Sequence, residues 1–377
     1  MGMVPLHLTH ETDYMIKGVI QMKKLFKSFL VLSLVFSLFG CGERESPPQP
    51  NTSADNKTEA ITESSTEAAT EAETEESTTE TDTTEAATDT AKSATDTDPV
   101  ESTTERVVLD LEDISETKEN AFTCTYDGVK HDFILSLPDE VENAPLIVLF
   151  HGAGDSPENF RRTSGFDNDA LPKGYAVCYV GGTVNGKAGR NSKSWNYGRL
   201  EPDNDDVGFI KALVNYLADE YSIDKEHVFC AGFSNGGFMN FRLALEAQDT
   251  VLACVSVGGD LCKTLWKVRP EKNDVGMLVV YGENDESIPK NIDGSSKTAL
   301  DPAIEEVIDY MASSNGLEKK SEDEIGDGSI LCKYGADSDK DMVWSVVVND
   351  GKHGWPTKEL DGFSVNELIL EFFENWR

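Results

Sequence analysis

One short stretch of the chain, FCAGFSNGGFMNF, contains the residue type that points most directly to chemistry. Gly232, Ser234 and Gly236 fit the pattern G-x-S-x-G, in which a serine on a sharp strand-to-helix turn acts as a nucleophile. The chain has 30 glycines among 377 residues, so a serine in an ordinary glycine-rich loop would give the same pattern. The elements on either side of the serine must therefore decide what it does.

Those elements are of the right kind. The run HVFCAGF ends at Phe233 and predicts a β-strand, while NGGFMNFRLALEA has its apolar residues on a helical repeat and predicts a helix. Ser234 falls between them, where the free N–H groups and positive dipole end of a helix face developing negative charge. The context predicts that Ser234 is a nucleophile on such a turn.

A serine hydroxyl needs a base to take its proton and an acid to orient that base. The run GMLVVYGENDESIPK supplies Asp285 just after a buried strand, and VWSVVVNDGKHGWP supplies His353 after the last strand. The order Ser, Asp, His along the chain is that of α/β hydrolases. Glu283 and Glu286 remain alternatives for the acid, in the same loop.

The intermediate of acyl transfer also needs donors for its oxyanion. The run LIVLFHGAGDS ends a strand in a loop, and we expect the backbone N–H groups of Ala153 and Asn235 to form the oxyanion hole. For Asn235 the backbone, rather than the side-chain amide, is expected to matter. His151 is expected to order this loop, and His131 and His227 do not follow a downstream strand.

The chain from 106 to 377 alternates apolar runs with amphipathic stretches, as an α/β sheet with helices on both faces does. The runs from PLIVLF onward are apolar throughout, as buried parallel strands are. We expect one catalytic domain over 106–377 with an α/β-hydrolase fold and a mostly parallel central sheet. The expected helices cover about 207–221, 236–247, 302–313 and 364–376.

The N-terminal region 1–41 has the pattern of an export signal. After Met22, which is itself a candidate start, three lysines precede an apolar run too short to span a membrane comfortably. The run ends in LFGC, which resembles the lipobox of bacterial lipoproteins and predicts a lipid anchor on Cys41. We therefore expect an extracytoplasmic protein held at the bacterial cell surface. An ordinary cleaved signal with a secreted product, or an uncleaved anchor, is the alternative.

Residues 42–105 are dominated by Thr, Glu, Ala, Ser and Asp, and cannot bury enough apolar surface to fold. We interpret them as a disordered acidic linker. The linker carries a net charge of about −15 out of −36 for the whole chain, and neither part favours a basic groove for nucleic acid. Six cysteines follow Cys41, without the spacing of a metal site and without a predicted pairing: Cys124, Cys178, Cys230, Cys254, Cys262 and Cys332.

Five stretches of the chain resemble a known group of esterases. PLIVLFHGAGDS, SWNYG, the block over 205–244, GENDESIP and KHGWP occur in this order in polyhydroxybutyrate depolymerase, feruloyl esterase and acetyl xylan esterase relatives, and the likeness covers about 121–377. It implies ester hydrolysis through an acyl-enzyme, without a cofactor. It also implies that Trp195 and Trp355 line the substrate cleft, although a core position is the alternative for each. Ser194 and Lys352 depart from the usual Cys and Gly of these relatives.

The expected activity is removal of feruloyl or acetyl groups from plant polysaccharide such as xylan. Expected partners are an acylated polysaccharide or another ester, and a membrane through Cys41, with the chain acting as a monomer. The first alternative is hydrolysis of polyhydroxyalkanoate esters. More distant alternatives are a peptidase-like serine hydrolase and a surface binding protein without catalysis.

Overall fold

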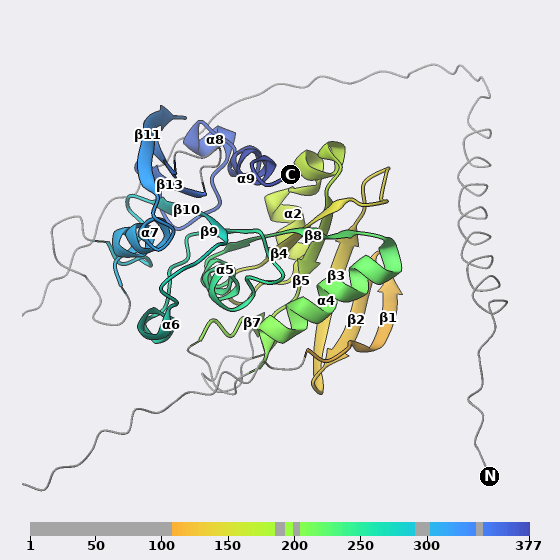
Figure 1. Cartoon of the computed structure of the whole chain (residues 1–377). Helices are drawn as coiled ribbons and strands as arrows, with labels where there is room; N and C mark the ends of the chain where they lie inside the picture. The colour runs from red at the N-terminus through yellow and green to blue at the C-terminus, as the bar shows by residue number, and fades with distance from the viewer. Residues whose placement is uncertain (1–107, 185–192, 199–203, 291–301, 337–341) are drawn as a thin grey trace, which may run out of the picture. The chain divides into compact units, whose positions relative to one another are not determined.

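A computed structural model describes residues 108–184, 193–198, 204–290, 302–336 and 342–377. The expected export signal, Cys41 and the linker lie outside these residues. An 11-stranded sheet runs through the described part in the order β1-β2-β3-β5-β4-β8-β9-β10-β13-β12-β11 (Figure 1). Its strands are β1 (Glu112–Lys118), β2 (Ala121–Tyr126), β3 (Val129–Ser136), β4 (Pro145–Phe150), β5 (Ala176–Val180), β8 (Asp224–Phe233), β9 (Ala253–Val257), β10 (Gly276–Gly282), β11 (Glu318–Ile325), β12 (Ser329–Gly335) and β13 (Val343–Val348).

The centre of this sheet is parallel. Strands β5, β4, β8, β9, β10 and β13 pair in parallel with their neighbours, and all are apolar runs that the sequence predicts as buried strands. All six residues of β4 are buried, because β5 and β8 flank the strand and helices cover both faces. Parallel strands of this kind end together at one edge, which places the loops after β4, β8, β10 and β13 close to one another.

Antiparallel strands complete the sheet at both sides. Strands β1, β2 and β3 form a meander next to β5, and β12 and β11 form a hairpin next to β13. The sequence does not predict β11, because its residues EKKSEDEI are almost all charged and mostly exposed. An antiparallel edge strand can face water, and charges there discourage pairing with another chain. A separate two-stranded ribbon joins β6 (Thr183–Val184) to β7 (Lys193–Ser194).

Helices cover the two faces of the sheet (Figure 1). Buried residues of α4, α5 and α7 pack in one apolar cluster, and those of α2, α3 and α9 pack in another on the opposite face. The four expected helices are present with ends shifted by up to two residues, and the shorter ones are additional. The bounds are α2 (Pro157–Ser164), α3 (Asp167–Ala170), α4 (Asp206–Tyr221), α5 (Asn235–Glu246), α6 (Lys263–Val268), α7 (Ile304–Ser313), α8 (Lys358–Asp361) and α9 (Val365–Glu374), with a 3₁₀ turn over Leu171–Lys173.

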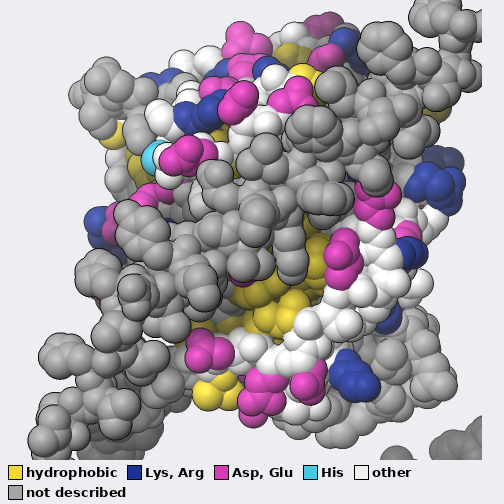
Figure 2. Space-filling view, turned by 90° about the vertical axis from the view of Figure 1, so that its right-hand side faces the viewer, with side chains coloured by type: hydrophobic (Ala, Val, Ile, Leu, Met, Phe, Trp, Pro, Cys, Tyr) yellow, Lys and Arg dark blue, Asp and Glu magenta, His cyan; other side chains and the backbone are white. Residues whose placement is uncertain are grey.

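The surface of the described part carries charges of both signs. On the face in Figure 2, Asp and Glu side chains are interspersed with Lys and Arg, and hydrophobic side chains gather in its lower middle. None of the helices in the described residues is both long and apolar enough to cross a membrane.

Candidate active site

Ser234 occupies a strained turn between β8 and α5. Its backbone has φ 52° and ψ −115°, a conformation that residues with a Cβ adopt rarely and at a cost of about 1–3 kcal/mol. The turn is held by a hydrogen bond from the Ser234 N–H to the carbonyl of Val257, at 2.8 Å, and by the first turn of α5. The strand, the turn and the helix are thus present where the sequence predicts them.

The two glycines of the pattern make this turn possible. A Cβ on Gly232 would lie 2.6 Å from the carbonyl carbon of Gly236, and a Cβ on Gly236 would overlap the carbonyl group of Phe150 at the end of β4. Any larger side chain at either position would push the turn away from its neighbour. The glycines therefore bring Ser234 close to the loop that follows β4.

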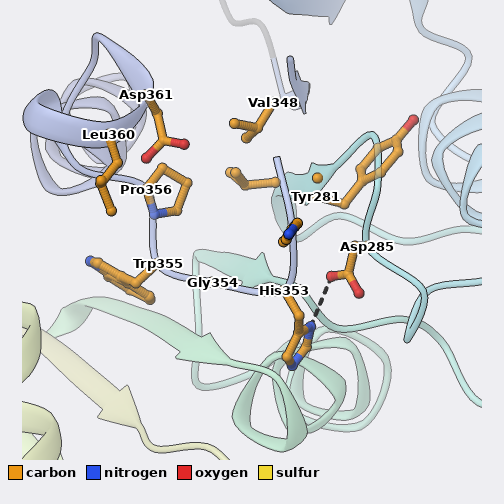
Figure 3. A pocket seen from close by; sticks show the side chains of 13 residues that line it. Tyr281, Asp285, Val348, His353, Gly354, Trp355, Pro356, Leu360 and Asp361 are labelled. Carbon is orange, nitrogen blue, oxygen red and sulfur yellow. Dashed lines mark hydrogen bonds and ion pairs between the residues drawn. The ribbon is translucent and has the colours of Figure 1, made fainter. Parts of the chain in front are cut away.

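His353 and Asp285 reach Ser234 from two other loops. The Nε2 atom of His353 lies 2.9 Å from the Oγ atom of Ser234, and its Nδ1 atom lies 2.8 Å from the Oδ2 atom of Asp285. A carboxylate only accepts hydrogen bonds, so Nδ1 carries the proton and Nε2 accepts the serine hydroxyl. Figure 3 shows the imidazole directed toward Asp285. This is the geometry by which a histidine base removes a serine proton.

Asp285 is the acid that the structure brings to His353. Its side chain is only 1% exposed, and its Oδ1 atom accepts the N–H of Ser287 at 2.8 Å. Burial alone would raise the pKa of Asp285, but the hydrogen bonds from His353 and Ser287, with the charges of His353 and Lys290, hold it below its usual value. Asp285 therefore stays ionised at neutral pH.

The two alternative acids lie elsewhere in the same loop. Glu283 and Glu286 are both exposed, and a carboxylate oxygen of Glu283 accepts the N–H of Asp350 at 3.2 Å. Of the three carboxylates in this loop, it is that of Asp285 that is in direct hydrogen-bond contact with His353. The geometry thus separates Asp285 from its neighbours, which the sequence alone leaves open.

The expected oxyanion donors lie on the two elements that meet at Ser234. Asn235 is the first residue of α5, so its N–H has no acceptor within the helix. Ala153 lies exposed in the loop after β4, next to Gly152, where a Cβ would be 3.6 Å from the Cβ of Ser234. Both positions border the nucleophile, and their role as donors stays a prediction.

His151 orders that loop in the way the sequence suggests. Its ring is fully buried, Nδ1 donates to the carbonyl of Gly152 at 2.7 Å, and Nε2 accepts the N–H of Gly182 at 3.0 Å. Burial lowers its pKa, so the ring is neutral and serves as a structural link between the loops after β4 and β5.

Trp195 does not line a cleft, contrary to what the resemblance implies. Its side chain has no exposed surface, its Nε1 donates to the carbonyl of His151 at 3.1 Å, and its ring packs edge-on against Phe150 at 5.0 Å. A ring enclosed in this way cannot stack on a substrate. Full burial depends on contacts with residues far away in the sequence, so the local pattern SWNYG cannot indicate it.

Trp355 has a different environment. It is half-buried, donates from Nε1 to the Oδ1 atom of Asn366 at 2.9 Å, and packs edge-on against Phe160 at 5.4 Å. It lines a cavity of about 220 Å³ together with His353, Asp285 and Leu360 (Figure 3). Contact of Trp355 with a substrate stays a prediction.

Two contacts at the site were not expected from the sequence. The ring of Phe233 lies 4.9 Å from the imidazole of His353, and the aromatic residue directly before Ser234 is the feature of the sequence that could have indicated this contact. The side-chain amide of Asn235 makes two hydrogen bonds to the backbone of Trp195, although the sequence suggested that only the Asn235 backbone matters. Within the described residues the six cysteines are all free, and no cluster of His, Cys, Asp or Glu side chains could hold a metal ion.

A nucleophile on a strained turn, with acid and base on later loops at the same edge of a parallel sheet, is the arrangement of an α/β hydrolase. The family model described as Phospholipase/Carboxylesterase matches residues 133–321, which is half of the chain and includes Ser234 and Asp285. The chain belongs to this phospholipase/carboxylesterase family of α/β hydrolases.

Several known proteins are similar to the chain in sequence. A protein of Nocardia uniformis subsp. tsuyamanensis named as an esterase, NocK, is 32% identical over 57% of this chain and 66% of its own length. Feruloyl esterase B of Piromyces equi is 27% identical over 32% of this chain and 22% of its own length. Feruloyl esterase D of Neurospora crassa is 27% identical over 61% of this chain and 76% of its own length. The chain thus spans less than two thirds of the first two relatives.

Solved structures are also similar to the chain, at low identity. The acetyl xylan esterase from Aspergillus awamori matches with a TM-score of 0.46 and 13% identity, over 65% of this chain and 94% of that one.

Proposed function

We propose that this chain is a serine carboxylic-ester hydrolase. The observation that carries the proposal is the unbroken hydrogen-bonded chain from the Oγ atom of Ser234 through His353 to the buried carboxylate of Asp285. The strained conformation of Ser234 supports it, because such strain persists where a function requires it. Membership in a family of carboxylesterases adds support from the sequence as a whole.

In the first half of the reaction, the Oγ atom of Ser234 attacks the ester carbonyl while Nε2 of His353 takes its proton. The carbonyl oxygen becomes an oxyanion, which the N–H groups of Ala153 and Asn235 stabilise. The carboxylate of Asp285 stabilises the imidazolium that forms. Collapse of the intermediate breaks the bond to the alkoxy oxygen, His353 returns the proton to the leaving alcohol, and an acyl-enzyme remains.

In the second half, water takes the place of the alcohol. His353 removes a proton from the water as it attacks the acyl carbonyl, and the same two N–H groups receive the second oxyanion. Collapse releases the carboxylic acid and returns the proton to Ser234. The cycle consumes one water for each ester bond and leaves the enzyme unchanged.

For the substrate we propose feruloyl or acetyl esters of plant polysaccharide such as xylan. The names of the feruloyl esterases of Piromyces equi and Neurospora crassa support this class, as does the half-buried Trp355 beside His353. An exposed indole face can stack on a phenolic ring or a sugar. We further propose that the enzyme works outside the cytoplasm, anchored through a lipid on Cys41, because residues 22–41 have the pattern of a lipoprotein signal.

The test is hydrolysis of p-nitrophenyl acetate and methyl ferulate by the purified protein, beside its Ser234→Ala variant. We expect turnover by the wild type and a loss of at least about 10⁴-fold in the variant. A folded wild-type protein that cleaves neither ester would refute the esterase proposal. Equal activity in the variant would remove Ser234 from the nucleophile role.

A substrate panel then tests the finer proposal. Acetylated and feruloylated xylo-oligosaccharides should be cleaved with higher kcat/KM than short oligomers of 3-hydroxybutyrate. The reverse order would favour the polyester alternative. For the anchor, mass spectrometry of the membrane fraction should find Cys41 as a lipid-modified N-terminus, and an unmodified soluble product would contradict it.

A further inference from the structure

The side-chain amide of Asn235 forms a reciprocal pair of hydrogen bonds with the main chain of Trp195. The Oδ1 atom accepts the Trp195 N–H at 2.7 Å, and the Nδ2 atom donates to the Trp195 carbonyl at 3.3 Å. All of these groups are buried. Because this pairing uses both the oxygen and the nitrogen of the amide, it fixes the Asn235 side chain against the backbone of Trp195. The first residue of α5 is thereby tied to a segment 40 residues earlier in the chain.

The segment that contains Trp195 is also hydrogen-bonded to the loop after β4 at two points. The Nε1 atom of Trp195 donates to the carbonyl of His151 at 3.1 Å, and the carbonyl of Lys193 accepts the N–H of Gly154 at 2.7 Å. These two contacts lie on either side of Ala153. They fix the peptide groups that flank its N–H, and with them the direction in which this N–H points.

We infer that Asn235 is a positioning residue whose amide sets the distance between the two halves of the oxyanion hole. This inference rests on the proposed function. One donor belongs to Asn235 itself and the other to Ala153, on a separate loop. The segment over 193–195 joins them, with Asn235 at one end and the neighbours of Ala153 at the other. The fully buried ring of Trp195 makes this link rigid.

Asn235 thus has two separable parts. Its N–H belongs to the proposed oxyanion hole and is kept by any substitution except proline. Its amide is hydrogen-bonded to the backbone of Trp195, so its loss changes the position of the donors without removing one. Catalysis is sensitive to this, because a displacement of about 1 Å can lower the rate by about 100-fold.

The first experiment compares Asn235→Ala with the wild type in ester hydrolysis. We expect kcat to fall by about 10- to 100-fold while KM changes by less than about threefold, because the oxyanion exists in the transition state and not in the bound ester. The affinity for a boronic acid, which forms a tetrahedral adduct with the serine, should fall in parallel. A merely structural role would not move that affinity.

Asn273→Ala is the matched control. Asn273, like Asn235, is a buried amide, and its Oδ1 atom accepts the N–H of Val275 in a loop before β10. Its loss should lower the melting temperature without changing kcat. If Asn273→Ala lowers kcat as much as Asn235→Ala does, the effect is general destabilisation and the inference is wrong.

Trp195→Phe gives an independent test should Asn235→Ala fail to fold. It keeps a buried ring and removes the donor to the His151 carbonyl, so it should lower kcat with the same small change in KM. In the double variant the two losses should be far from additive, because both act on one chain of contacts. Losses that multiply independently would contradict the inference.

The outcomes also separate the inference from the proposed function. An inactive wild type would overturn both. An active wild type with an inactive Ser234→Ala variant, beside an Asn235→Ala variant that is folded and retains kcat within about threefold, would overturn the inference alone.

Discussion

Replacing Asp285 by asparagine would isolate the role of one buried carboxylate with almost no change in volume. In the wild type, Oδ2 accepts from Nδ1 of His353 and Oδ1 accepts from the N–H of Ser287, each at 2.8 Å. Asparagine has one oxygen for these two donors. If its NH₂ group faces His353, Nδ1 must accept, the ring proton moves to Nε2, and Ser234 loses its base. If its NH₂ group faces Ser287 instead, the Ser287 N–H loses the acceptor it has in the wild type.

The charge is lost in both cases. At about 4 Å and an effective dielectric constant of about 20, a carboxylate stabilises the imidazolium by about 4 kcal/mol, which corresponds to about 10³ in rate. The tautomer change adds to this, so we expect kcat to fall by about 10³- to 10⁴-fold, with KM little changed. Steady-state hydrolysis of p-nitrophenyl acetate would measure it.

The exposed neighbour Glu286 provides the control. Glu286→Gln removes a charge one residue away and should leave kcat within about twofold of the wild type. The reasoning would be refuted if Asp285→Asn kept kcat within about tenfold of the wild type, or if the loss appeared in Glu286→Gln instead.

Three further predictions concern stability and specificity. Ser234→Gly should relieve the positive φ and raise the free energy of unfolding by about 1 kcal/mol while abolishing turnover, and a lower value in urea unfolding would contradict the strain. Burial lowers the pKa of His131, whose ring stacks on Phe209, to about 4. The unfolded chain then binds more protons between about pH 4 and 6.5, so stability should fall by about 2 kcal/mol from pH 7.5 to 5, and His131→Phe should remove that part of the slope in urea titrations at both pH values. Trp355→Ala should lower kcat/KM for methyl ferulate about three- to tenfold more than for p-nitrophenyl acetate, and an unchanged ratio would exclude a stacking role.

The sequence predicts those strands and helices in which buried positions are occupied by a recognisable pattern of apolar residues. Strand β4 is apolar at every position, because both faces of a central parallel strand are covered. Strand β11 is the opposite case, since an edge strand with exposed faces needs no apolar run and its charges read as a loop. Helix α2 has few apolar residues, yet Ser156 caps it and Pro157 begins it, a start signal that the sequence did contain.

The triad is predictable for a related reason. Residues that follow parallel strands meet at one edge of the sheet, so the order Ser, Asp, His after three strands already places them together. The sequence favours Asp285, but only geometry separates it from Glu283 and Glu286, because three acids in one loop differ in the direction of their side chains. The hydrogen bonds between Asn235 and Trp195 could not be predicted from the sequence for another reason. The segment over 193–198 has no periodic pattern, and Asn235 lies 40 residues after Trp195.

The burial of Trp195 changes where recognition of an aromatic acyl group would take place. With that ring enclosed, two partly exposed aromatic side chains lie next to the base in the described part of the chain: Phe233, whose ring lies 4.9 Å from that of His353, and Trp355, two residues beyond His353. Both pack on the same apolar cluster. A phenolic ring held there would rest on the loop that also positions the base. Substrate recognition and proton transfer would then depend on the same loop, so a change at Trp355 should alter both kcat and KM for a ferulate ester. The acetyl ester has no phenolic ring to bind there, so its kcat would show only the effect of the change on His353.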